Sequence, residues 1–421
     1  VRASVATNET DAEAAAAQIA KDGYFAVKGG EMNVEKGASF VVAYSLKRVE
    51  VTGGQVKNAG RFDAGSSDMT LENAVFANTG KLESEGKLTI GKGGVLETAA
   101  SKSEAFDMEG GVVLNEGGTL KFTALNSTFE DPRKAEAQAE EGTEEKPAVP
   151  VEKQKDQLLI AGTTYTLAGG AIEGVDSVKI GRNDDAAHMT IKKGDYRFEN
   201  VRLGNSTKTD GASTLNVEGG KLTVTGLLDL RYGQTTVDGG KLALEGEYLT
   251  GKNEGTLVVK KGTFATSGAN LFDEVKAEAK EGVEKPAAPS YEISDLLEKG
   301  DFRGGVIEVT DEGLKLTQAQ VAAAVEMLKD AGIGSNLVFS DVTFTDEKLA
   351  FDDALGLNGK GQTMEAGASE DGVTTLVVAE TTAAVGKLVV DEKTESVTVS
   401  KGEGDAIGVL QITGTAEGGN V

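Results

Sequence analysis

Residues 213–265 read STLNVEGGKLTVTGLLDLRYGQTTVDGGKLALEGEYLTGKNEGTLVVKKGTFA, and this stretch repeats itself at a fixed interval. The unit Leu215–Gly226 is followed twenty residues later by Thr235–Gly246, and about twenty-two residues after that by Leu257–Phe264. Self-similarity at a fixed period is the signature of a repeat architecture, so it decides the fold before any local pattern does.

Each copy has the content of one coil of a solenoid. Leu215 and Val217 alternate with polar residues, as in a strand with one buried face. Gly219 and Gly220 then permit a turn with positive φ. Apolar residues after this turn and after Gly226 form a second and a third short strand. Three strands and three corners in about twenty residues predict an all-β fold, a right-handed parallel β-helix with a few short helices.

Stacking such coils about 4.8 Å apart places like residues over like residues. We therefore expect Leu222 over Leu242 and Gly220 over Gly240, with positive φ in at least one of the two glycines. One coil cannot bury its own interior, so several coils are needed before any is stable. The period predicts a rod of about fifteen coils, roughly 70 Å long.

The composition agrees with such a stack and narrows the partners. Glycine is abundant (56 of 421 residues), proline is scarce (5), and tryptophan is absent, so the core consists of small aliphatic residues. The lack of cysteine excludes disulfides and thiolate metal sites, and suits a chain that crosses a bacterial envelope unfolded as well as a cytosolic one. A net charge of −25 argues against nucleic acid and anionic membrane surfaces as partners.

Interruptions of the pattern divide the chain. The expected segments are a helical cap at 1–23, coils at 24–133, a charged flexible insertion at 134–157, regular coils at 158–272, a second charged insertion at 273–300, and coils at 301–421 with an inserted helix at about 317–331. The insertions share a KAEA…EG…EKPA string, at Lys134–Lys155 and Lys276–Pro289. Both are expected to be exposed solvated loops, with a partner-binding arm as the alternative.

Asparagine recurs near the expected corners. Asn58, Asn73 and Asn78 lie at such positions. Asparagine tolerates the left-handed conformation, and its side chains can hydrogen-bond to one another from coil to coil. We therefore expect side-chain ladders at these corners.

Few residues suggest chemistry. His188 is the single histidine, and a surface or corner position is favoured over a catalytic triad, which needs serine and aspartate close in space. The pairs Asp184–Asp185 and Asp352–Asp353 offer oxygen ligands for Ca²⁺, but no calcium-loop motif accompanies them. Solvated acidic corners are the favoured interpretation, so we assign no metal and no cofactor.

The best enzymatic candidate is a cluster on two neighbouring coils. Polysaccharide lyases and glycosidases built on a β-helix need clustered aspartates with arginine or lysine on adjacent coils. Asp229 and Arg231 share one strand, and Asp238 follows in the next coil. The absence of tryptophan and the seven tyrosines leave few sugar-stacking platforms. No residue is therefore assigned a catalytic role.

The repeated units resemble the passenger region of a bacterial autotransporter, of the self-associating adhesin type. The residues that carry the likeness are Leu215–Leu222, Thr235–Leu242, Leu257–Phe264 and Val397–Gly402, and it covers about three quarters of the chain. Such passengers precede a membrane-embedded translocator barrel. The sequence stops at Val421 without one, so the resemblance implies a released or truncated passenger.

The resemblance implies a function without catalysis. We expect an adhesin on the bacterial cell surface, exported across the outer membrane and contacting a membrane only through the absent barrel. Its partner would be a second copy of itself, in aggregation and biofilm formation, or a host or matrix glycan or protein. A secreted polysaccharide-acting lyase or glycosidase on the same scaffold remains the alternative.

Overall fold

The structure is a computed structural model of the whole chain. It describes residues 24–42, 46–100, 105–125, 127–129, 155–182, 185–204, 213–250, 255–275, 290–310, 315–316, 318–333, 337–339, 343–344, 348–350, 363–365, 373–378, 382–385, 387–389, 396–401 and 409–412. The expected cap at 1–23 and the insertions at 134–154 and 276–289 lie outside these residues. In the described part, no helix is both long and apolar enough to cross a membrane.

The chain forms a right-handed parallel β-helix of about 8 turns, as the twenty-residue period predicts. It divides into two compact units: unit 1 is Val1–Thr236 with Gly251–Gly255, and unit 2 is Val237–Thr250 with Thr256–Val421. The turns are fewer than the fifteen expected, partly because single turns are long. Val112 pairs directly with Tyr165, so that turn takes up 53 residues (165 minus 112).

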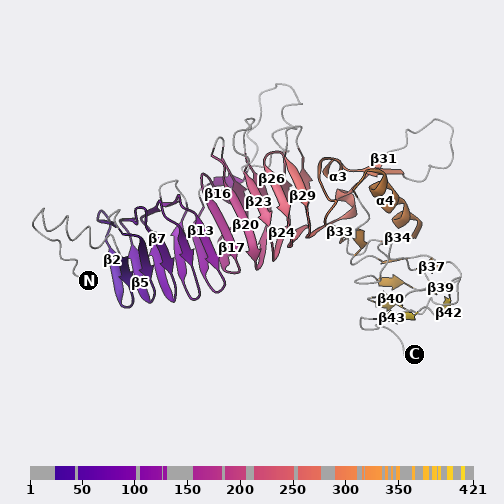
Figure 1. Ribbon diagram of the computed structural model, residues 1–421, viewed down its shortest axis with the longest axis horizontal. Coiled ribbons are helices and arrows are strands. Elements are labelled where there is room, and N and C mark those ends of the chain that lie inside the picture. The colour runs from indigo at the N-terminus through magenta and orange to yellow at the C-terminus, as the bar shows by residue number, and fades with distance from the viewer. Residues whose placement is uncertain are drawn as a thin grey trace, which may run out of the picture. The chain divides into compact units, whose positions relative to one another are not determined.

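The strands of unit 1 belong to five sheets, whose neighbouring strands lie side by side in Figure 1. Sheet A begins with β1 (Tyr24–Val27), β4 (Arg48–Val51), β7 (Asp68–Leu71), β10 (Leu88–Ile90), β13 (Val112–Asn115), β17 (Thr164–Ala168), β20 (His188–Lys193) and β23 (Thr214–Val217), and ends with β26 (Gln234–Val237) and β29 (Thr256–Val259). Sheet B consists of β2 (Glu31–Val34), β5 (Gly54–Asn58), β8 (Ala74–Asn78), β11 (Val95–Ala99), β14 (Thr119–Ala124) and β18 (Ala171–Glu173).

The other strands of unit 1 complete its coils. Sheet C consists of β3 (Ser39–Val41), β6 (Arg61–Asp63), β9 (Lys81–Ser84) and β12 (Phe106–Met108). Sheet D consists of β15 (Ser127–Phe129), β16 (Lys155–Ile160), β19 (Ser177–Ile180), β22 (Asn200–Leu203) and β25 (Leu227–Asp229). Strand β21 (Asp195–Phe198) pairs with β24 (Lys221–Val224), and β26 (Gln234–Val237) lies where unit 1 ends.

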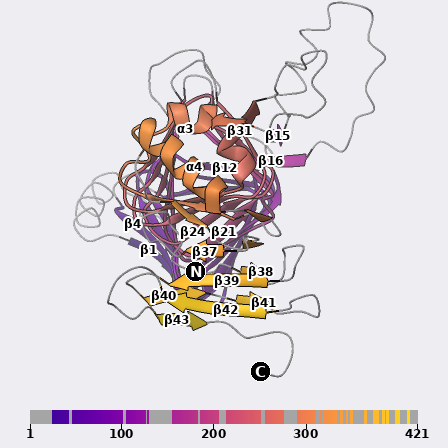
Figure 2. The same cartoon turned by 90° about the vertical axis from the view of Figure 1, so that its right-hand side faces the viewer.

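Unit 2 consists mostly of parallel strands and contains the helices of the described residues. Its strands are β27 (Lys241–Leu244), β28 (Glu247–Leu249), β29 (Thr256–Val259), β30 (Thr263–Thr266), β31 (Phe272–Val275), β32 (Ser290–Ile293), β33 (Val306–Val309), β34 (Lys315–Leu316), β35 (Leu337–Phe339), β36 (Thr343–Phe344), β37 (Lys348–Ala350), β38 (Thr363–Glu365), β39 (Val373–Val378), β40 (Thr382–Val385), β41 (Lys387–Val389), β42 (Ser396–Lys401) and β43 (Val409–Ile412). The helices are η1 (Gly268–Asn270), α3 (Asp295–Lys299) and α4 (Gln318–Asp330), and α3 and α4 lie near each other in Figure 2.

The structure differs from the sequence-based segments within 273–300. The expected helix at about 317–331 coincides with α4, but β32 and α3 lie within 273–300, where the sequence predicts an insertion. Leu296 and Leu297 of α3 are buried, which gives this segment an apolar anchor. Antiparallel pairs close the undescribed insertions, β15 with β16 around the first and β31 with β32 around the second.

The core of unit 1 is a set of aliphatic columns. In sheet A, one inward column contains only Val, Leu and Ile, all at most 5% exposed: Val27, Val51, Leu71, Ile90, Leu114, Leu167, Ile191 and Val217. Each such burial contributes about 1.5–3 kcal/mol. The parallel register places like residues over like residues, as predicted.

Aromatic rings from sheets A, B and C form a cluster near the start of the described coils. Phe25, Phe40, Phe62 and Phe76 follow one another with ring centroids 4.8, 5.0 and 5.2 Å apart. These spacings lie within the range in which tilted and edge-on ring pairs attract each other.

A buried asparagine ladder joins three coils of sheet B, as predicted for Asn58 and Asn78. Asn58 Nδ2 donates to Asn78 Oδ1 at 2.7 Å, and Asn78 Nδ2 donates to Thr98 Oγ1 at 2.9 Å. The same amide groups also donate to the backbone oxygens of Lys81 and Ala105. Asn73 occupies the left-handed region at φ 47°. The ladder therefore gives partners to both buried amide nitrogens, whereas Asn58 Oδ1 is buried without a partner among the described residues.

The glycine corners hold positive φ where the backbone needs it. Gly220 has φ +66°, as predicted, and a Cβ there would lie 2.3 Å from the carbonyl oxygen of Gly194 in the preceding coil. In the next copy the positive φ falls on Gly239, at 110°, rather than on Gly240. The Gly220 corner therefore approaches the neighbouring coil too closely for a side chain.

Replacing Gly220 by valine should destabilise the fold by about 1–3 kcal/mol, because it adds left-handed strain and a backbone clash. The matched control is Gly29→Val, where a Cβ meets nothing within 4 Å. Chemical denaturation followed by circular dichroism measures both variants. Equal stability of the two variants would contradict the assigned corner.

Replacing Asn78 by alanine should cost about 1–3 kcal/mol, because the buried amide of Asn58 and the Ala105 carbonyl each lose a partner. Asn33, exposed on the surface of the same sheet, provides the control substitution Asn33→Ala. Thermal unfolding of both variants tests the ladder, and a loss no larger than that of the control would count against it.

Candidate functional site

The sequence-derived enzymatic candidate is an internal ion network. Asp229 is fully buried on β25, and its Oδ1 accepts hydrogen bonds from Arg231 Nε at 2.9 Å and from the Arg231 backbone at 3.2 Å. Arg202, its partner in the preceding coil, lies 3.1 Å from Oδ2. Asp238 belongs to unit 2, where it lies 3.9 Å from Lys261. Two guanidinium groups thus hold Asp229 in place, an arrangement that favours a structural role.

The other candidates lie at the surface or outside the described residues. His188 begins β20 and is exposed, with Nδ1 2.9 Å from Thr214 Oγ1 of the next coil. Asp185 exchanges two backbone hydrogen bonds with Arg182. Asp184 and the pair Asp352–Asp353 lie outside the described residues. Within the described part of the chain, no three His, Cys, Asp or Glu side chains are placed to hold a metal ion.

Sequence reasoning missed a charged row on sheet C. Register places Asp63, Glu83 and Asp107 one above another on three successive coils, and Arg61 pairs with Lys81 beside them. Arg61 contacts both Asp63 and Glu83, and Lys81 contacts Glu83. A hollow of about 130 Å³ is lined by Arg61, Asp63, Glu83 and Asp107 together with Ser84, Glu85 and Glu109. Lys81 is not among its lining residues. The sequence pattern that could have revealed this row is Arg-x-Asp at 61–63, followed twenty residues later by Lys-x-Glu at 81–83.

Glu83 is the electrostatic centre of this row. Burial opposes its ionisation more than any other single effect, but hydrogen bonds from Lys81 and Arg61 together hold its pKa below the ordinary value. The hydrogen bond to Glu83 in turn raises the pKa of Lys81. Since the folded pKa of Glu83 is depressed, its contribution to stability is present above the unfolded pKa of 4.5 and is lost as pH falls through the folded value.

Glu83→Gln should therefore destabilise the protein by about 1–2 kcal/mol at neutral pH, because it removes two charge-assisted hydrogen bonds. The difference from the parent chain should shrink as pH falls below 4.5. Urea denaturation at a series of pH values measures it, with the exposed Glu35→Gln as control. A difference that is constant with pH would refute the role given to the Glu83 carboxylate.

Sheet B presents a flat outward face, which we call face B. Its first row consists of Glu31, Gln55, Val75, Val95, Thr119 and Ala171. Its second row consists of Asn33, Lys57, Ala77, Glu97, Lys121 and Glu173. Two lysines and two glutamates alternate in the second row, so its formal charges cancel. With Glu31 of the first row, face B carries two lysines and three glutamates and so a formal charge of −1.

Sheet A carries a row of hydroxyl groups. Its outward positions between the inward columns are half-buried in most coils and include Thr70, Thr89, Val113, Thr166, Thr190 and Asn216. Adjacent members are one coil, about 4.8 Å, apart. Both sheets therefore display regular polar rows, which suit contact with an extended partner.

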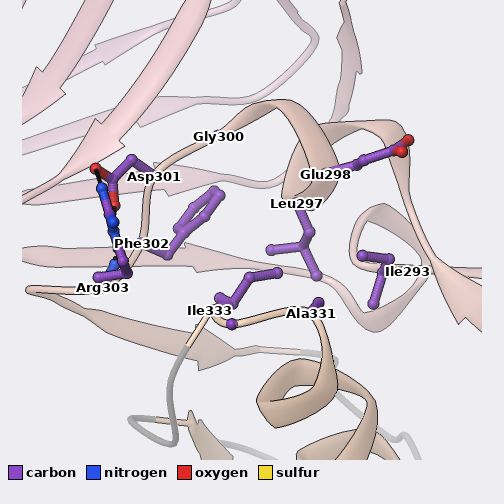
Figure 3. Close-up of a pocket in the computed structure, with 10 residues that line it drawn as sticks. Ile293, Leu297, Glu298, Gly300, Asp301, Phe302, Arg303, Ala331 and Ile333 are labelled. Carbon is purple, nitrogen blue, oxygen red and sulfur yellow. Dashed lines mark hydrogen bonds and ion pairs between the residues drawn. The ribbon is translucent and has the colours of Figure 1, made fainter.

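Unit 2 contains a hollow of about 440 Å³ where α3 faces the end of α4 (Figure 3). Phe302, Leu297 and Ile333 point toward one another and form its floor, but they are only 2%, 1% and 8% exposed. At the rim, Arg303 donates hydrogen bonds to Asp301 and lowers the pKa of that carboxyl to about 2. The floor is thus closed by its own packing and offers a ligand little apolar surface.

Comparison with known proteins gives no match. No protein-family model, no curated protein and no solved structure is similar to the chain.

Proposed function

We propose that this chain is a non-enzymatic adhesin of the bacterial cell surface, which self-associates or attaches to a host or matrix glycan or protein. The observation that supports this proposal is the pair of regular polar rows on sheets A and B, which continue over at least five coils. Each hydrogen bond or ion pair across such a surface contributes only about 1 kcal/mol net. Their sum grows with the number of coils in contact.

The autotransporter-like repeat supports the location given in this proposal. A passenger of this type would be exported across the outer membrane and displayed in many copies. Many weak contacts between displayed copies add avidity, since each contact after the first forms at high effective concentration. Aggregation and biofilm formation would follow from this display.

One observation favours the alternative of a polysaccharide-acting enzyme. The row of Asp63, Glu83 and Asp107, with Arg61 and Lys81 beside it, has the combination of carboxylates and cations on adjacent coils that such enzymes use. Its central carboxylate is already engaged by both cations, however, as in a structural network. We therefore rank this function second.

Sedimentation of the purified chain across a salt series tests self-association. The net charge should oppose association at low ionic strength, and the repulsion should fade near 0.15 M, where screening acts beyond about 8 Å. Beads that display the chain should clump in the same range. Monomers at every salt concentration together with dispersed beads would leave only a heterologous ligand, and release of reducing ends or unsaturated sugars from a polysaccharide panel would promote the enzyme.

A further inference from the structure

We propose that two copies of this chain meet through face B in antiparallel orientation, about a two-fold axis that passes by Val75 and Ala77. This inference rests on the self-association proposed above and names the surface that performs it. The axis runs parallel to the strands. The coils of the second copy therefore follow in the opposite order, and each outward row faces the same row of the other copy.

The order of charges on face B favours close approach of a second copy. The described residues contain 29 Lys and Arg and 33 Asp and Glu, so they carry a net charge of −4, and most of the chain's −25 belongs to residues outside them. On face B the alternating lysines and glutamates cancel. Val75, an exposed large apolar side chain at 36% exposure, lies in the middle of this face beside Ala77. Two copies can therefore approach here with little repulsion and bury Val75 against its own copy.

The order of the charges selects the register. With the axis at Ala77, Lys57 of each copy faces Glu97 of the other, which gives two opposite-charge contacts by symmetry. Asn33 then faces Lys121, and Gln55 in the first row faces Val95. No like charges meet.

Neighbouring registers lack these ion pairs. An axis half a coil toward Glu97 sets Lys57 against Lys121, and an axis one full coil in that direction sets Glu97 against its own copy. An axis half a coil toward Lys57 sets Lys57 against Ala77 and Glu97 against Asn33, which brings no like charges together but forms no ion pair. Like charges directly opposite each other are destabilising. A larger shift pairs Glu97 with Lys121 without repulsion, but it leaves only four coils in contact and moves Val75 away from the axis.

The charges involved can exchange partners. Within one chain Lys57 lies 2.7 Å from Glu31, and Lys121 lies 3.1 Å from Glu97. All four side chains are 40–49% exposed in these pairs. Such exposed ion pairs contribute little to stability, so exchanging them for intermolecular pairs costs little.

The expected contact is small. Five coils and strands of about five residues cover about 400 Å² on each copy. Stable interfaces bury about 800 Å² per partner, so a single pair of chains should associate weakly. The two ion pairs also weaken at high salt, so association should rise toward about 0.15 M and fall again near 1 M.

Charge reversal at the two facing positions tests the surface. Lys57→Glu sets a new carboxylate against the Glu97 carboxylate of the other copy, and Glu97→Lys sets a new ammonium group against the ammonium group of Lys57. Each single variant of the full-length chain should self-associate at least tenfold more weakly than the parent chain in sedimentation equilibrium, because like charges then face each other. The double variant, which restores opposite charges, should associate like the parent. Lys261→Glu and Glu35→Lys, with the same charge changes away from face B, are the controls.

Mixing the two single variants gives the sharpest result. In a pair of two identical single variants, both facing contacts bring like charges together. In a mixed antiparallel pair, the Lys57→Glu copy offers two carboxylates and the Glu97→Lys copy offers two ammonium groups, so both contacts join opposite charges. The mixture should therefore associate although neither component does. Circular dichroism confirms that each variant is folded.

Two outcomes would separate this surface from self-association in general. Parental association that neither single variant weakens, or a mixture that stays monomeric, would overturn this surface while leaving self-association standing. A parent chain that is monomeric throughout would overturn both this surface and self-association, and would leave only attachment to a heterologous ligand.

Discussion

The hydrogen-bonded stacking of one coil on the next is the constraint on which the rest of this structure depends. It fixes neighbouring strands about 4.8 Å apart and keeps every residue beside its equivalent in the next coil. Equivalent positions of successive coils therefore favour the same type of residue. Inside, the result is columns of Val, Leu and Ile and an Asn58–Asn78–Thr98 ladder that pairs the buried amide nitrogens of both asparagines.

The same constraint shapes the outer surface. Stacking places like charges close together unless the sequence prevents it, and repulsion across neighbouring strands is destabilising. Sheet C relieves a row of three carboxylates with Arg61 and Lys81, which contact Glu83 from two coils. Sheet B instead alternates lysine with glutamate along one row. On sheet C the charged groups pair with one another within the chain. On sheet B they stay half-exposed and are able to contact another molecule.

The sequence predicts most of the architecture and little of the functional surface. The twenty-residue copies around Leu222 and Leu242 predict the coil, its glycine corners and the inward columns, because a periodic pattern reports a periodic structure. The α3 helix was missed because a five-residue helix has no resolvable period, although Ser294 followed by Asp295 is a helix-start signal. Rows such as Asp63–Glu83–Asp107 depend on register between coils of twenty and twenty-four residues, which a fixed period does not supply.

Cross-linking through a single introduced cysteine tests the central claim most directly, because the chain has no cysteine of its own. Facing sheets pack about 10 Å apart, so a bifunctional maleimide of similar reach should join two copies of a Val75→Cys variant across the two-fold axis. Val41→Cys, at 52% exposure on sheet C, is the matched control. The account predicts covalent dimers for Val75→Cys and monomers for Val41→Cys at about 0.15 M salt. Equal dimer yields from both variants, or none from Val75→Cys in a sample that sedimentation shows to be associated, would contradict it.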